Sequence, residues 1–141
     1  MATKADFTDA EWQVLQWAVA DTITYLSMAD PGLWDTFKET SKAVKYIAGM
    51  RTAGASPLVR ELATHAHTRR DKDVSADPAG MADEVTGRVS LAASLLKRKA
   101  PDDLDAFREF IIGVATATAE AAHGMGPAEQ AALAKLEAAL A

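Results

Sequence analysis

The feature that most constrains the fold is the stretch from Leu104 to Leu140, where apolar residues recur at spacings of three and four. This period places side chains on one face of an α-helix. Gly124 and Gly126 interrupt the pattern, and Pro127 suits the first position of a second helix with Gly126 as its N-cap. The stretch therefore predicts two helices joined by a tight turn. Their expected buried residues are Phe107, Phe110, Ile111, Val114, Ala117, Thr118 and Ala121 in the first helix, then Ala132, Leu133, Leu136 and Leu140 in the second.

The rest of the chain repeats the helical period, and no segment sustains the alternation of a β-strand. Hydrophobic residues make up 49% of the 141 residues but aromatic residues only 6%, a mixture that favours closely packed helices over a β-sandwich. The length suits one domain. We predict an all-α fold, a single-domain bundle of about six helices over residues 1–141. The expected helices run over about 8–28, 33–50, 57–68, 78–98, 101–123 and 127–140.

Composition also narrows the function. The chain has no cysteine, which excludes disulfides, zinc–thiolate sites and thiol nucleophiles. No secretory signal is visible at the N-terminus, and the apolar run from Phe110 to Ala119 has about half the ~20 residues that span a bilayer. The net charge of −5 argues against nucleic acid as the main partner. A cytoplasmic protein without a membrane or nucleic-acid partner is expected.

The first predicted helix has a well-defined start and an unusual apolar coverage. Thr8 and Glu11 have the spacing of a capping box, and Phe7 and Trp12 that of a hydrophobic staple. Apolar residues cover more than one face, so we expect this helix to be central or at a subunit interface, and we predict a homodimer. Asp21 interrupts this coverage and lies either at a solvent-facing gap or in a functional pair, since unpaired burial is costly.

Two further segments carry specific expectations. In the second predicted helix an apolar face is expected against the core, made by Leu33, Trp34, Phe37, Val44, Ile47 and Ala48. Residues 68–79 are charged and hold a turn signal at Asp77 and Pro78. These residues predict a mobile loop. The loop is the best candidate in the chain for a segment that orders on binding.

The two ends of the chain resemble each other. Trp12 aligns with Phe107, Val19 with Val114 and Asp30 with His123, which suggests two pseudo-repeated helical hairpins. The segments Ala29-Asp30-Pro31-Gly32 and Ala122-His123-Gly124 with Glu129 are similar to the signature of the tellurite-resistance TerB-like helical family. Here Pro31 separates the first Asp from Gly, and His123 stands in place of the second Asp. The resemblance implies a helical bundle with a role in metal binding or stress-linked signalling.

The spacing Glu120-x-x-His123 is the one with known metal chemistry, because helical residues three apart share a face. Di-iron bundles need two such motifs, and only Glu61 and His65 offer a substitute for the second. The alternative is that Glu120 and His123 form a surface pair at a helix end, without a metal. Our candidate ligands for a divalent metal are Glu120, His123, Asp30 and Glu129.

The tryptophans at positions 12, 17 and 34 are most simply core residues, or else they line a hydrophobic ligand pocket or a dimer face.

The sequence therefore favours a small, non-catalytic helical module with a stress-associated interaction or metal-responsive role and with protein partners. It supports no catalytic or cofactor-binding residue. Two other classes stay open: a metal-dependent bundle enzyme using Glu120 and His123, and a binder of a hydrophobic small molecule.

Overall fold

The computed structural model describes residues 2–28, 36–66, 78–122 and 126–141, with side chains for 2–28, 42–66, 80–120 and 126–141. Within these ranges the chain forms six α-helices and two short 3₁₀-helices and no strand, which confirms the all-α bundle. The α-helices are α1 (Asp9–Ser27), α2 (Thr36–Ala53), α3 (Pro57–Thr64), α4 (Pro78–Lys99), α5 (Leu104–Ala122) and α6 (Pro127–Leu140). The 3₁₀-helices are η1 (Lys4–Asp6) and η2 (Pro101–Asp103).

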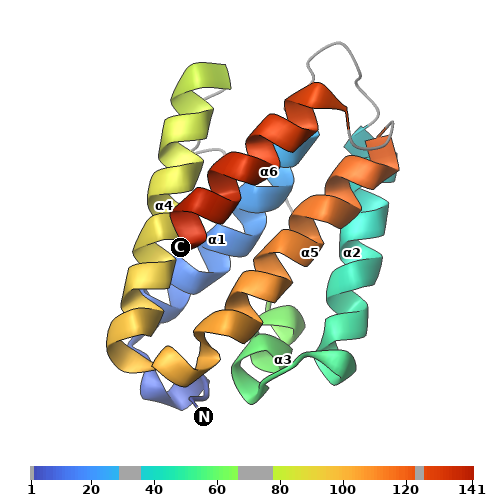
Figure 1. Cartoon of the computed structure of the whole chain (residues 1–141). Helices are drawn as coiled ribbons and strands as arrows, with labels where there is room; N and C mark the ends of the chain where they lie inside the picture. The colour runs from blue at the N-terminus through green and yellow to red at the C-terminus, as the bar shows by residue number, and fades with distance from the viewer. Residues whose placement is uncertain (1, 29–35, 67–77, 123–125) are drawn as a thin grey trace.

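The helices pack side by side around α1 (Figure 1). α1 contacts α4 and α5 extensively; α6 packs on α4, while α2 packs on α5. The short α3 lies beside the C-terminal end of α2 and closes that end of the bundle. No helix in the described ranges combines the length and the apolar character needed to cross a membrane.

The start of α1 is formed as its sequence predicts. The Glu11 backbone N–H donates to the Thr8 hydroxyl at 3.1 Å, and the Thr8 N–H donates to the Glu11 carboxylate at 2.9 Å. The Phe7 and Trp12 rings pack against each other across this cap, with centroids 6.3 Å apart and planes tilted by 47°. The capping box satisfies backbone donors that the first turn of a helix leaves open, and the staple fixes the angle at which the chain enters the helix.

The C-terminal half of α1 is buried on every side. Every residue from Ala18 to Leu26 is buried, including three polar ones, Asp21, Thr22 and Thr24. The two threonine hydroxyls donate to the carbonyls of Ala18 and Ala20 one turn earlier, so their burial leaves no donor unsatisfied. α1 is thus the central helix, and one chain covers the faces on which the homodimer prediction rested. Association in solution stays a prediction.

The inward face of α2 is offset by one residue from the predicted one. Ile47 is 1% exposed as expected, but Val44 is 39% exposed and Ala48 is also on the surface. The residues that face α5 are instead Ala43, Tyr46 and Met50, because Tyr46 packs on the α5 backbone. Leu33, Trp34 and the Phe37 side chain lie outside the described parts of the chain.

Three helix boundaries also differ from the prediction. α2 continues past Gly49 to Ala53 and ends at Gly54, whose N–H donates to the Met50 carbonyl. α3 ends at Thr64, four residues early, with His65 as its C-cap. The turn η2 occupies the predicted first turn of the fifth helix, and α5 begins only at Leu104. These ends are set by tertiary contacts, which period alone does not report.

The predicted loop over 68–79 lies outside the described residues, apart from its last two. Pro78 and Ala79, where the predicted loop and the predicted helix overlap, belong to α4, which begins at Pro78 as predicted. Pro78 at the first helical position suits the start of a helix.

The two end hairpins are present, but they are not packed equivalently. A two-fold exchange of the hairpins would place α6 on α1 as α2 is placed on α5. Instead α2 lies along α5 over its whole length, whereas α6 touches α1 little and packs chiefly on α4. The repeat therefore extends to the helix order and not to the packing.

Candidate functional site

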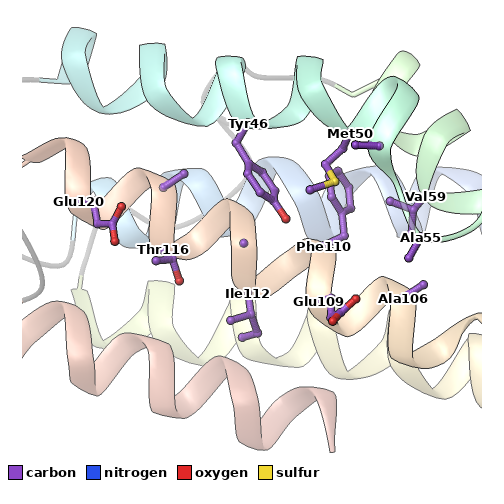
Figure 2. A pocket seen from close by; sticks show the side chains of 13 residues that line it. Tyr46, Met50, Ala55, Val59, Ala106, Glu109, Phe110, Ile112, Thr116 and Glu120 are labelled. Atoms are coloured by element: carbon purple, nitrogen blue, oxygen red, sulfur yellow. The ribbon is translucent and has the colours of Figure 1, made fainter.

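A groove of 590 Å³ runs between α2 and α5 (Figure 2). From α2, α3 and the link between them it is lined by Tyr46, Met50, Ala53, Ala55 and Val59. From α5 it is lined by Ala106, Glu109, Phe110, Ile112, Gly113, Thr116, Ala117 and Glu120. Most of these side chains are apolar, so the groove offers apolar surface with a few polar groups, as small-molecule and peptide sites do.

Gly113 lets α2 and α5 approach closely in the middle of the groove. A Cβ at position 113 would lie 1.9 Å from the Tyr46 hydroxyl oxygen and 2.2 Å from the adjoining ring carbon. Real contacts between such atoms are never that short, so the tyrosine sits directly on the α5 backbone only because position 113 is glycine. Figure 2 shows Tyr46 reaching from α2 toward α5.

The aromatic floor of the groove is a stacked pair. The rings of Tyr46 and Phe110 have centroids 6.3 Å apart and planes 20° apart, within the range of favourable aromatic contacts. Burial raises the pKa of Tyr46 above 10, and the negative charge of Glu109 raises it further. The hydroxyl therefore stays protonated at neutral pH. It makes no hydrogen bond to any described residue, which leaves it free to donate or accept in the groove.

Two glutamates from α5 border the groove. Glu109 and Glu120 are both exposed, and neither forms an ion pair with a described residue. They share one face of α5 with Ile112, Gly113 and Thr116, since their positions follow the helical period (Figure 2). At a rise of ~1.5 Å per residue their backbones lie about 16 Å apart along the helix. The groove is thus apolar along its floor and negatively charged toward both ends.

This arrangement suits binding better than chemistry. The polar groups within reach are two carboxylates, one tyrosine hydroxyl and the Thr116 hydroxyl. An activated nucleophile needs an adjacent base that is oriented by a third group, and these residues do not form such a set. An apolar floor with carboxylates near its ends favours a ligand that has an apolar face and positive charge.

Two of the four predicted metal ligands lie among the described residues. Asp30 and His123 lie outside the described residues. Glu120 is exposed at the groove, while Glu129 is only 4% exposed and folds back over Gly126 at the start of α6. Among the described residues no group of three or more histidine, aspartate or glutamate side chains could hold a metal ion. The site of four ligands stays a prediction.

The substitute motif on α3 is used differently. The Glu61 carboxylate accepts a hydrogen bond from the Lys4 backbone N–H, and so ties the N-terminal segment to α3. His65 is exposed beyond the end of α3, and its carbonyl accepts from the Gln16 side chain at 3.0 Å. Both residues fasten neighbouring elements together, which is a structural role.

The tryptophans do not line the groove. Trp12 is 4% exposed in the core, and Trp17 is half-buried beneath Arg88, whose guanidinium carbon lies 5.0 Å from the ring centre. Arg88 also donates to the Asp21 carboxylate at 3.1 Å. Of the two interpretations of Asp21, the structure therefore supports a paired group, and the pair joins α1 to α4. Trp34 lies outside the described residues.

Comparison of the chain with protein-family models, with curated proteins and with solved structures found no match. The resemblance to TerB-like proteins accordingly stays a prediction, and the argument for function rests on the residues of this chain.

Sequence reasoning missed the groove, although three of its residues carried a signal. Gly113 interrupts an otherwise strong helical segment, and a glycine inside a helix costs about 1 kcal/mol relative to alanine unless something packs against it. Glu109 and Glu120 fall on the same face as that glycine. What the sequence does not contain is the partner of Gly113, because Tyr46 lies 67 positions away in α2.

Proposed function

We propose that the protein is an interaction module and that it binds its partner in the groove between α2 and α5. The observation that carries this proposal is an apolar hollow bordered by two glutamates that have no cationic partner among the described residues. A folded chain gains nothing from keeping apolar surface in contact with water, so a groove of this kind favours an occupant.

The setting of this binding is also a proposal. The resemblance to TerB-like proteins supports a stress-associated or metal-responsive role, with binding rather than catalysis as the activity. A groove that binds an apolar group also keeps the hydrophobic small-molecule reading in play, with Tyr46 and Phe110 as its aromatic residues in place of the tryptophans.

The test uses N-phenyl-1-naphthylamine, a neutral apolar dye whose fluorescence rises on leaving water. Ala53 is exposed and lines the groove, whereas Ala48 is exposed on the same helix and does not. We expect saturable dye binding that Ala53→Trp weakens about five- to tenfold by filling the groove, and that Ala48→Trp leaves unchanged. Circular dichroism confirms that both variants fold. Equal dye binding by the two variants, or no saturable binding at all, would contradict the proposal.

A further inference from the structure

The spacing of Glu109 and Glu120 carries information about the shape of the occupant. Eleven residues complete three turns of an α-helix to within about 20°, so both carboxylates project from nearly the same line along α5. On the α5 wall Glu109 lies toward the Ala106 end of the groove and Glu120 lies at the opposite end.

We propose that the occupant is a helical segment of a partner protein, with an apolar stripe facing the groove and two basic residues eleven positions apart. The apolar stripe packs on Ile112, Met50 and the Tyr46 ring, and the basic residues pair with Glu109 and Glu120. This inference rests on the proposed function, because it names the partner class for the same groove.

The walls of the groove favour a helix over other shapes. α2 and α5 lie side by side, and a third helix laid between them continues the packing that forms the bundle itself (Figure 1). Ala106 and Ala117 are small residues of the groove face of α5 on either side of the Tyr46 contact, and small side chains let another helix approach to the usual ~8–10 Å between axes. Amphipathic helices bind in such grooves through anchors at the same three- and four-residue spacing.

The match in rise explains why eleven residues are required. A helix laid along α5 has the same rise of ~1.5 Å per residue, so its residues eleven apart are separated by the same ~16 Å as the two glutamates, whichever way the chain runs. A small amphipathic cation spans much less and reaches only one carboxylate. The charges act on register and specificity more than on affinity, because ion pairs at the rim of an interface are partly solvated.

The experiment compares two synthetic 18-residue peptides of identical composition, each capped at both ends and each with leucines on one face. One peptide has lysines at positions 4 and 15, and the other has them at positions 4 and 8. Affinity is measured by isothermal titration calorimetry for the full chain and for Glu109→Gln, Glu120→Gln and the double variant. Glu137→Gln is the matched control, since Glu137 is exposed on α6 away from the groove.

We expect the peptide with the eleven-residue spacing to bind more tightly than the other by at least about threefold. Each single glutamine variant lowers its affinity about two- to fivefold and the double variant more, while Glu137→Gln does not. The preference shrinks at 0.5 M salt, where exposed charges are screened.

Two results would overturn the inference. Equal affinity for the two peptides would remove the spacing argument. Dependence on Glu120 or Glu109 alone would indicate a compact cation in place of a helix. If the full chain does not distinguish the two peptides but still binds the dye, only this inference is refuted. If the full chain does not bind the dye either, the proposed function is refuted as well.

Discussion

Two helix contacts in this protein, α1 with α4 and α2 with α5, combine carboxylates with aromatic rings. Only in the contact between α1 and α4 does the described chain also supply a cation for the carboxylate. In the first, Asp21 is fully buried and Arg88 spans from its carboxylate to the face of Trp17. In the second, Glu109 lies near the stacked Tyr46 and Phe110 rings and Glu120 lies at the far end of the groove, and neither has a cation from the described residues.

The difference shows that burial determines whether a carboxylate needs a cation from its own chain. A carboxylate removed from water is costly unless its own chain neutralises it, so the aspartate on α1 comes with an arginine. A carboxylate at the surface loses little when it is unpaired, so the glutamates on α5 stay available to a partner. Four predictions break or sharpen this comparison.

The largest effect is expected at the contact between α1 and α4. Replacing Arg88 by methionine keeps the apolar stem but leaves the Asp21 carboxylate buried without its arginine, and we expect a loss of about 2–4 kcal/mol in the free energy of unfolding. Urea denaturation measures it. Adding Asp21→Asn to Arg88→Met removes the buried charge and should recover part of the loss. A change below about 0.5 kcal/mol in the single variant would mean that the pair is not needed there.

The next effect concerns the glycine beneath Tyr46. Gly113→Ala places a methyl group where the tyrosine hydroxyl lies, so the ring must leave its position on Phe110, and we expect a loss of about 1–2 kcal/mol in stability. Gly87→Ala is the control, because a Cβ at position 87 meets nothing within 4 Å. That variant should be more stable by about 0.5–1 kcal/mol through helix propensity. Thermal unfolding of both variants checks the contrast, and the same sign for both would refute it.

A third effect appears in acid at the start of α1. The hydrogen bond from Lys99, then the hydrogen bonds with Thr8 and last the charge of Lys99 lower the pKa of Glu11 from 4.5 to about 2. A carboxyl whose pKa is lowered by folding adds stability that is present above pH 4.5 and is lost as the pH falls toward 2. Glu11→Gln should therefore flatten the dependence of the melting temperature on pH in this range. An NMR titration of the Glu11 carboxyl that gave an ordinary pKa would contradict the assignment.

The smallest effect is a shift in a tyrosine titration. The chain has two tyrosines, and burial raises the pKa of both, with Asp83 adding to the effect at Tyr25 and Glu109 at Tyr46. Because these pKa values are raised by folding, the associated stability is present below pH 10 and is lost as the pH rises through the folded values. Glu109→Gln should lower one of the two pKa values in an absorbance titration at 295 nm. A shift in the pKa of both tyrosines, or of neither, would contradict the proximity of the Glu109 charge to Tyr46.

The sequence predicted the helices well because their starts are local. Thr8 with Glu11, Ser56 with Pro57, and Gly126 with Pro127 each lie within four residues of the turn they begin, and each starts a helix in the structure. Most of the buried faces predicted for α5 and α6 follow from the helical period in the same way, although Ala117 lines the groove and Leu133 is half-buried. Helix ends were displaced by three or four residues: α3 ends at Thr64 without a local stop signal, and α2 continues past Gly49 to the second glycine, Gly54.

The candidate site was decided by the tertiary structure alone. Nothing near Tyr46 in the sequence shows that it faces inward while Val44 faces water, because both fit an apolar stripe and differ only in what α5 offers them. The groove exists because α2 lies along α5, and Gly113 is open just where the tyrosine ring arrives. The period of three and four residues determines a helix from interactions within one turn. Which faces meet, and which surface is left for a partner, depends on contacts between residues far apart in the chain.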